Sequence, residues 1–289
     1  MHYLLIVLSV VMFGGCFKLN DVYREIRGSS FRVSQEFILI SALSAVPILF
    51  ILGGFKLEAT PFTIVMASLC AINGIAFSYF SFMALGKINL SLYSLFSMLG
   101  GMTLPFLQGL LFYGEPLSVA KAVCFVFITA ALVLTVKPGE GKGGLIYYAG
   151  IFVLNGMSGV LSKIFVSAEY PKTDSTIYSM WGAIITVILA AVSLLVIRCF
   201  GKGEPARFSA ASVGVAVSSG VVNKIANLIL VISLAFVDTS IQYPMVTGGV
   251  IIVSTLGCFI GKSKRPSRNE IISVGLAFVG TLCLFLIPV

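Results

Sequence analysis

The stretch Ser68–Ala76 reads Ser-Leu-Cys-Ala-Ile-Asn-Gly-Ile-Ala, and a related stretch follows it 150 residues later. Ser218–Ala226 reads Ser-Ser-Gly-Val-Val-Asn-Lys-Ile-Ala, in which serine, asparagine, isoleucine and alanine recur in the same register. The same offset pairs further positions: Tyr93 with Tyr243, Ser97 with Thr247, Pro116 with Pro266, and Leu132 with Leu282. Several matches in one register indicate a duplicated chain. The copies differ at an informative place, because Gly74 in the first is Lys224 in the second.

Composition points to a membrane protein. The 289 residues are 58% hydrophobic and 10% charged, with a mean hydropathy of +1.06. A soluble domain carries charge on about a quarter of its residues. We therefore predict a multi-pass protein of the cell membrane, with the lipid bilayer as a partner. The net charge of +8 does not indicate nucleic acid, because the basic residues lie in short loops between apolar spans, where the positive-inside rule puts them.

The cysteines give no sign of a metal site. All six lie in or beside apolar spans, none forms a Cys-x-x-Cys pair, and the chain has a single histidine, His2. This pattern argues against a zinc site or a disulfide framework. No Walker-type phosphate-binding loop is present either. We expect no cofactor and no metal.

Charged residues, glycines and prolines divide the chain into ten apolar spans. A bilayer core of about 30 Å needs about 20 residues of helix, and the predicted spans meet that length. Their limits are 3–19, 34–54, 61–86, 90–113, 117–136, 144–167, 174–198, 209–236, 239–260 and 269–287. The longest polar stretches, 20–33 and 201–208, are expected to be loops. The predicted fold class is an all-α integral membrane protein with ten transmembrane helices.

The repeat offset covers five helices, which is an odd number. The second half therefore enters the membrane in the opposite sense to the first, and the predicted fold is two inverted five-helix repeats. The first repeat covers 1–137 and the second covers 144–289, and both join one bundle with a binding site at the midplane. Small residues are expected to bring helices close together. They are Gly14, Gly15, Gly100, Gly101, Gly156, Gly159, Gly248 and Gly249.

The basic residues are unevenly divided between the two sides of the membrane. Three lie on the side of the termini: Lys56, Lys121 and Lys172. Thirteen lie on the opposite side: Arg24, Arg27, Arg32, Lys87, Lys137, Lys142, Arg198, Lys202, Arg207, Lys262, Lys264, Arg265 and Arg268. The positive-inside rule puts the thirteen in the cytoplasm and both termini outside.

Residues 84–134 resemble a known repeat. Ala-Leu-Gly-Lys-Ile-Asn at 84–89, Pro105 within the next span, and Tyr-Gly-Glu-Pro-Leu-Ser at 113–118 are similar to one EamA repeat of the drug/metabolite transporter superfamily. The second half resembles it too, with Leu-Ala-Phe-Val-Asp at 234–238. The resemblance implies a secondary transporter that exports amino acids or related compounds by alternating access. Many members have cytoplasmic termini, opposite to the charge count.

Lys224 is the leading candidate for substrate binding. A cation near the bilayer centre costs at least about 2.5–3.5 kcal/mol, and such residues are functional by default. Lys224 contacts either an anionic substrate or a carboxylate from another helix. Asn223 and Asn227 place a polar stripe beside it, and Asn73 is its counterpart in the first half. These asparagines serve either a cavity or helix–helix packing.

Five further residues are candidates with two readings each. Glu36 is the expected counter-charge of Lys224, or else it reaches the membrane interface. Tyr93 and Tyr243, with Gln242, either gate the cavity or lie in an aromatic belt. Trp181 either forms a wall of the pocket or anchors its helix in that belt.

These observations predict a transporter of small polar or amphipathic metabolites such as amino acids or other carboxylates. The alternatives are an exporter of lipophilic cations or drugs with Glu36 as the proton-exchanging site, and a membrane scaffold or sensor without transport. An enzyme is not expected, because the spans lack a nucleophile with a nearby base. Coupling to a proton or a counter-substrate is left open, as is the choice between a monomer and a homodimer.

Overall fold

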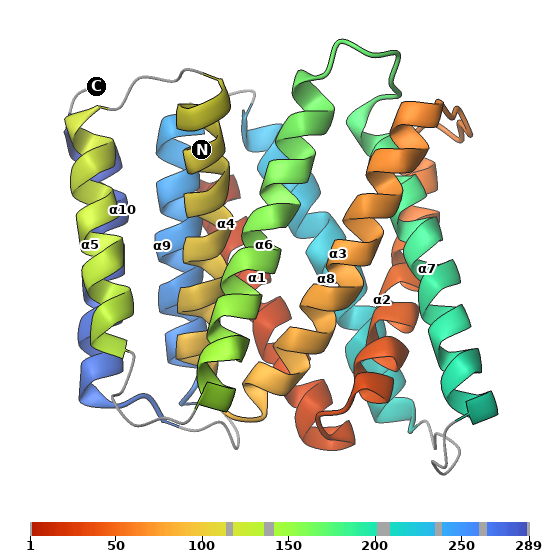
Figure 1. Cartoon of the computed structure of the whole chain (residues 1–289), viewed down its shortest axis with the longest axis horizontal. Coiled ribbons are helices and arrows are strands. Elements are labelled where there is room, and N and C mark those ends of the chain that lie inside the picture. Colours follow the sequence, from red (N-terminus) through yellow and green to blue (C-terminus); the bar gives the residue numbers. More distant parts are fainter. Residues whose placement is uncertain are drawn as a thin grey trace.

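The computed structural model describes residues 2–113, 118–135, 142–200, 209–234, 239–259 and 265–287. These residues form ten helices and no strand. The helices are α1 (His2–Arg27), α2 (Phe31–Leu52), α3 (Pro61–Leu85), α4 (Leu90–Phe112), α5 (Val119–Thr135), α6 (Lys142–Ser167), α7 (Ser175–Phe200), α8 (Ala210–Leu234), α9 (Thr239–Gly257) and α10 (Arg268–Leu286). Figure 1 shows them side by side in one bundle, with both termini towards the same end.

Helix α1 is longer than the apolar pattern predicted. The polar stretch after residue 19 was expected to be a loop, but α1 continues to Arg27 and α2 begins at Phe31. Gly28 turns the chain with a φ of +87°, and the Ser30 hydroxyl accepts a hydrogen bond from the Val33 amide at the start of α2. The polar residues continue the helix because Lys18 and Arg24 form ion pairs with Asp21 at helical spacing. This expectation of a long loop was wrong.

The helices are apolar enough for a membrane protein. Within the described part of the chain, six have the length and composition to cross a bilayer. They are Leu4–Arg27, Phe31–Leu52, Pro61–Leu85, Leu90–Phe112, Ile146–Ser167 and Ser175–Cys199. Large apolar side chains such as Leu4, Ile72, Leu111 and Leu195 are exposed on the outside of the bundle. An outer surface of this kind suits hydrocarbon. The chain is an all-helical protein compatible with a multi-pass membrane protein.

Most of the helix packing joins the first five helices to the last five. Helix α1 packs on α8 and α9, α3 packs on α6 and α7, and α4 packs on α6 and α9. Helix α2 packs on α7 and α8, and α5 packs on α10. Helices α5 and α10 lie together at one edge of the bundle, and α7 lies towards the other (Figure 1). Neither set of five forms a separate domain.

Glycines allow two helices to touch at backbone level. A methyl group added at Gly100 of α4 would collide with the Phe152 carbonyl of α6, and one added at Gly156 would lie 2.5 Å from the Gly100 carbonyl oxygen. Similar collisions occur at Gly14, Gly101, Gly159, Gly248 and Gly249, as expected. Gly15 is the exception, because nothing lies within 4 Å of its added methyl group. Close approach was therefore predicted wrongly for Gly15.

Candidate functional site

Lys224 lies near the middle of α8, ten residues from its C-terminal end at Leu234. At 1.5 Å per residue this is a depth of about 15 Å, which its stem cannot span to reach the interface. The side chain is half-buried. Among the described residues no carboxylate lies within 4 Å of Nζ, and Nζ donates no hydrogen bond. The ammonium group is available to a ligand.

The thiol of Cys70, on α3, is an electrostatic neighbour of Lys224. The phenol of Tyr178, on α7, lies beside this thiol and beside the Ser162 hydroxyl of α6. These contacts do not have hydrogen-bond geometry, so the buried Tyr178 hydroxyl has no partner within the described structure. We call Cys70, Ser162, Tyr178 and Lys224 the polar cluster; Ser162 is exposed, and Tyr178 lies three residues from the start of α7. Four helices contribute one member each.

The ring of Tyr178 is held by the aromatic residues around it. It stacks on Phe165 of α6 with ring centroids 4.0 Å apart and an angle of 13° between the planes. Phe62 of α3 lies parallel to Phe165, with ring centroids 6.0 Å apart. The Tyr178 ring is therefore packed within a row of aromatic rings from α3, α6 and α7.

The three asparagines have different environments. Asn73 is buried, and its Nδ2 donates to the Leu154 carbonyl of α6 at 2.9 Å. Asn227 is exposed, and its Nδ2 donates to the Asn223 carbonyl at 2.8 Å and to the Asn223 side-chain oxygen at 3.2 Å. Asn73 therefore joins two helices, which is the packing role considered for it. Asn227 thus bonds back to Asn223, the residue directly before Lys224.

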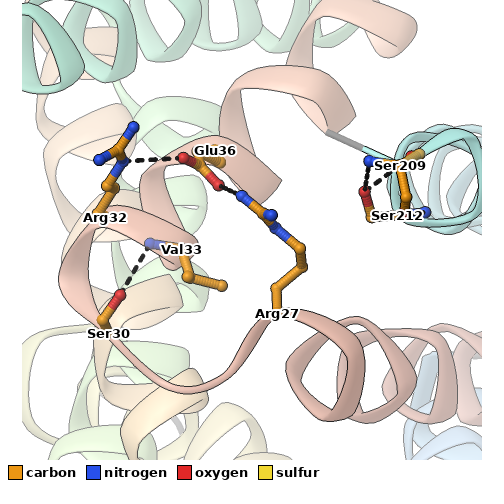
Figure 2. A network of polar contacts seen from close by, with 7 residues as sticks. All are labelled: Arg27, Ser30, Arg32, Val33, Glu36, Ser209 and Ser212. Atoms are coloured by element: carbon orange, nitrogen blue, oxygen red, sulfur yellow. Dashed lines mark hydrogen bonds and ion pairs between the residues drawn. The ribbon is translucent and has the colours of Figure 1, made fainter. Parts of the chain in front are cut away.

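Glu36 is not the counter-charge of Lys224. Its side chain is 1% exposed, and its two oxygens are taken by Arg27 Nη2 at 2.6 Å and Arg32 Nε at 3.0 Å. Figure 2 shows the two guanidinium groups approaching the carboxylate from different sides, with Ser209 and Ser212 of the α8 start nearby. The three residues close the junction of α1 and α2. The expected pair was wrong because the two arginines lie far closer in sequence than Lys224 does.

The aromatic candidates have structural contacts. Tyr93 is completely buried, donates to the Ser81 hydroxyl at 3.1 Å, and packs edge-on against Phe17. Its burial excludes a place in a lipid-facing belt. Trp181 donates from Nε1 to the Glu58 carbonyl at 2.9 Å, which ties α7 to the connection before α3. The side chains of Gln242 and Tyr243 lie outside the described residues, although their backbone belongs to α9.

Sequence reasoning passed over Cys70 and Ser162. Cys70 has the composition of an apolar filler, and Ser162 follows a helical pattern with its hydroxyl bonded to the Ser158 carbonyl at 2.9 Å. Their one detectable signal was position: Cys70 lies one turn before Asn73, and Ser162 precedes Lys163. The only sequence signal of Tyr178 is its i, i+3 spacing from Trp181.

Among the described residues, no acidic side chain belongs to the middle of a helix. The four acids inside helix bounds, Asp21, Glu25, Glu36 and Glu270, all lie within seven residues of a helix end. Of the other acids, the described ones, Glu58, Glu169 and Asp174, lie between helices, and the remaining four are outside the described residues. The described centre of the bundle thus holds a positive charge at Lys224 and no negative one.

Comparison with known proteins supports the fold. A solved structure described only as "Crystal structure of protein" aligns with 99% of this chain, and 97% of that chain is covered. The TM-score is 0.59 and the sequence identity is 16%. No protein-family model matches the chain, and no curated protein matches it. A likeness at this identity shows the fold alone.

Fold and site together define a class. The chain is an all-helical protein with long apolar helices, and a single cation without an acidic partner lies deep in its described interior. Charged residues inside membrane spans are rare and often line the path or binding site of a polar ligand.

Proposed function

We propose that this protein is a secondary transporter of the EamA type, which moves small metabolites carrying a carboxylate by alternating access around a central site. The observation that carries the proposal is Lys224, which lies about 15 Å from its helix end without an acidic partner among the described residues. Placing a cation there costs several kcal/mol. A bound anion offsets that cost, whereas no described protein group does.

The helix packing supports two inverted five-helix repeats. Exchanging each helix with the one five places along turns the contact of α1 with α8 into that of α6 with α3. The same exchange converts the α1–α9 contact into the α6–α4 contact. The α2–α7 and α5–α10 contacts are unchanged by it, because the two helices of each pair simply trade places. This is the pattern expected from a two-fold axis in the membrane plane, with substrate bound between the halves.

The two halves are unequal where the repeats correspond. Gly74 of α3 has nothing within 4 Å of an added methyl group, so the position equivalent to Lys224 is open. The open space and the cation lie on helices from different halves, with Cys70 one turn from Gly74 and beside Lys224. This arrangement suits a ligand held between the halves.

Transport by purified protein in liposomes tests the proposal. The wild-type protein is expected to carry radiolabelled carboxylates, and Lys224→Met to lose at least about 30-fold in rate, because losing a buried charge-assisted contact costs 2 kcal/mol or more. Lys163→Met is the matched control, since Lys163 lies four residues from the end of α6 and faces the Tyr113 ring. Equal transport by wild type and Lys224→Met would refute the role of this lysine.

The alternative functions make different predictions in the same assay. An exporter of lipophilic cations with Glu36 as its proton carrier is not favoured, because both Glu36 oxygens are occupied by arginines. A scaffold or sensor is indicated if carboxylates bind to the purified protein and none is transported. Amino acids, other carboxylates and drug-like cations should therefore be assayed side by side.

A further inference from the structure

The last part of α1 is held differently from the first part. Before the Gly14–Gly15 pair, Ile6 and Val10 form an apolar cluster with Val250 of α9. After this pair, the hydrogen bonds, ion pairs and ring contacts of the helix reach α2, α3, α4 and α8. We call residues 16–27 the α1 end segment. It leads to the junction of α1 and α2 shown in Figure 2, at the end of the bundle opposite the termini.

Tyr23 of the α1 end segment is at the centre of a layer that joins four helices. Its side chain is completely buried, and its ring centroid lies 5.0 Å from that of Phe37 on α2 and 5.9 Å from that of Phe82 on α3. Val33 of α2 and Ala216 of α8 belong to the same buried cluster. All five residues lie within six residues of a helix end. The layer therefore closes this end of the bundle between α1, α2, α3 and α8.

Polar contacts fasten the α1 end segment to its neighbours. The Ser219 hydroxyl of α8 donates to the Asn20 side-chain oxygen at 2.9 Å, and the Cys16 thiol donates to the Ser219 carbonyl at 3.7 Å. Arg27 pairs with Glu36 of α2 at 2.6 Å. Water can replace both sides of such contacts, because folding exchanges hydrogen bonds to water for hydrogen bonds within the protein. These contacts suit a segment that is released and bound again.

Within the described chain, the second half has no helical counterpart of this segment. At the 150-residue offset Arg27 corresponds to Ile177, yet α6 ends ten residues earlier, at Ser167. Three aromatic positions of the first half also carry smaller residues in the second: Phe17 is replaced by Ser167, Tyr23 by Thr173 and Phe37 by Val187. The sequence thus provides a closing segment to one end of the bundle that the repeat does not provide to the other.

The Gly14–Gly15 pair gives α1 a place to bend. Glycine weakens a helix interior relative to alanine, and hinges often lie at small residues. A methyl group added at Gly14 would collide with Val253 of α9, whereas nothing lies within 4 Å of one added at Gly15. The helix is therefore packed on α9 up to Gly14 and has open space at the next residue.

We infer that the α1 end segment is a gate, which closes one end of the substrate path and opens by bending at Gly14–Gly15. Opening separates Tyr23 from Phe37 and Phe82 and admits water between the four helices. The inference rests on the proposed function, because alternating access requires each end of the path to open in turn. It goes beyond that function by naming the part that moves.

Two native cysteines test the motion in the wild-type protein. Cys16 of the α1 end segment and Cys124 of α5 are both 3% exposed. An opening gate admits a reagent to Cys16, whereas α5 stays packed on α10. The purified protein is treated with N-ethylmaleimide, each adduct is quantified by mass spectrometry, and each rate is divided by the rate in denaturant. Cys16 is expected to react at least tenfold faster than Cys124, and equal rates would overturn the gate.

A variant weakens the closed layer. Tyr23→Ala should raise the Cys16 rate at least fivefold and leave the Cys124 rate unchanged, because general unfolding would raise both. Tyr170→Ala is the matched control, since Tyr170 is 69% exposed, and it should change neither rate. Should Tyr23→Ala not fold, Asn20→Ala removes the hydrogen bond to Ser219 and tests the same opening. An unchanged Cys16 rate in the folded variant would contradict the gate.

A cross-link connects the motion to transport. Asn20→Cys and Ser219→Cys are combined in a Cys16→Ala background, and mild oxidation joins them across the contact that they make in the closed state. Transport into liposomes should fall at least tenfold and recover when the disulfide is reduced. The two single-cysteine variants, oxidised in the same way, are the controls and should keep their transport rate.

The outcomes separate the gate from the proposed function. Full transport by the cross-linked protein would overturn the gate and leave the transporter in place. Rapid labelling of Cys16 in a wild-type protein that transports no carboxylate, amino acid or cation would support the motion and refute the transport function.

Discussion

The buried carboxylate at the junction of α1 and α2 allows a quantitative prediction. Glu36 is 1% exposed, and it neutralises two arginines whose side chains are 16% and 29% exposed. Each pair has an attraction of about 4 kcal/mol if the charge centres are about 4 Å apart at an effective dielectric of 20. Desolvation of the three ions offsets much of this gain. The net effect of the cluster on stability is therefore smaller than the sum of its two attractions.

Removing only the carboxylate charge is a different change, because both arginines stay where they are. Glu36→Gln is expected to destabilise the protein by about 3–5 kcal/mol, the cost of breaking a buried pair on one side. At about 2–4 °C per kcal/mol, the melting temperature falls by roughly 10 °C. Trp181 is the only tryptophan and lies at a helix contact, so its fluorescence reports unfolding directly.

Two variants make this measurement decisive. Glu25→Gln is the matched control, because Glu25 is 21% exposed and lies 3.7 Å from Arg24; it should change stability by less than about 1 kcal/mol. Combining Glu36→Gln with Lys224→Met should give additive effects within about 0.5 kcal/mol, since the two residues share no partner. A melting temperature for Glu36→Gln within 2 °C of wild type, or its rescue by Lys224→Met, would refute this account of the cluster.

Three further predictions concern packing and orientation. Gly100→Val should abolish folding or lower the melting temperature by more than 10 °C, because its side chain meets the Phe152 carbonyl, whereas Gly15→Ala should be neutral; monodispersity by gel filtration distinguishes them. Asn73→Ala should cost about 0.6–1.7 kcal/mol in a melting measurement and leave transport unchanged; loss of transport in a folded variant would instead make it a binding residue. In a cysteine-free background, an impermeant thiol reagent added to intact cells should label Glu58→Cys and spare Arg265→Cys; the reverse pattern would put the termini in the cytoplasm.

Hydropathy predicted the helices well because the length of an apolar span is a local property of the sequence. The prediction of a loop at 20–33 was wrong because ion pairs between neighbouring turns stabilise the end of α1. Lys18 and Arg24 both pair with the buried carboxylate of Asp21, at 3.3 and 2.7 Å, and so hold a polar segment in helical form. Charge marked this segment as a loop, whereas its i, i+3 spacing marks a helix.

The site was less predictable, because its members come from four helices. Lys224 could be predicted by itself, because a charged residue within an apolar span is recognised from the sequence alone. The neighbours Cys70, Ser162 and Tyr178 carry no such signal, and only the packing of α3 against α6 and α7 brings them together. Glu36 was expected to pair with Lys224 and instead pairs with Arg27 and Arg32. Opposite charges in a sequence do not show how far apart the two side chains lie in the folded protein.

The packing of α1 has a consequence for how the chain is synthesised. The polar groups of α1 find their partners on α8: Ser9 donates to the Ala226 carbonyl, Cys16 to the Ser219 carbonyl, and Asn20 accepts from the Ser219 hydroxyl. Helix α8 begins about 180 residues after α1 ends. At 5–20 residues per second, the ribosome needs about 10–40 s to make that segment. Helix α1 is thus synthesised well before the helix that completes its polar contacts, and its polar face needs water, lipid headgroups or an insertion factor in the interval.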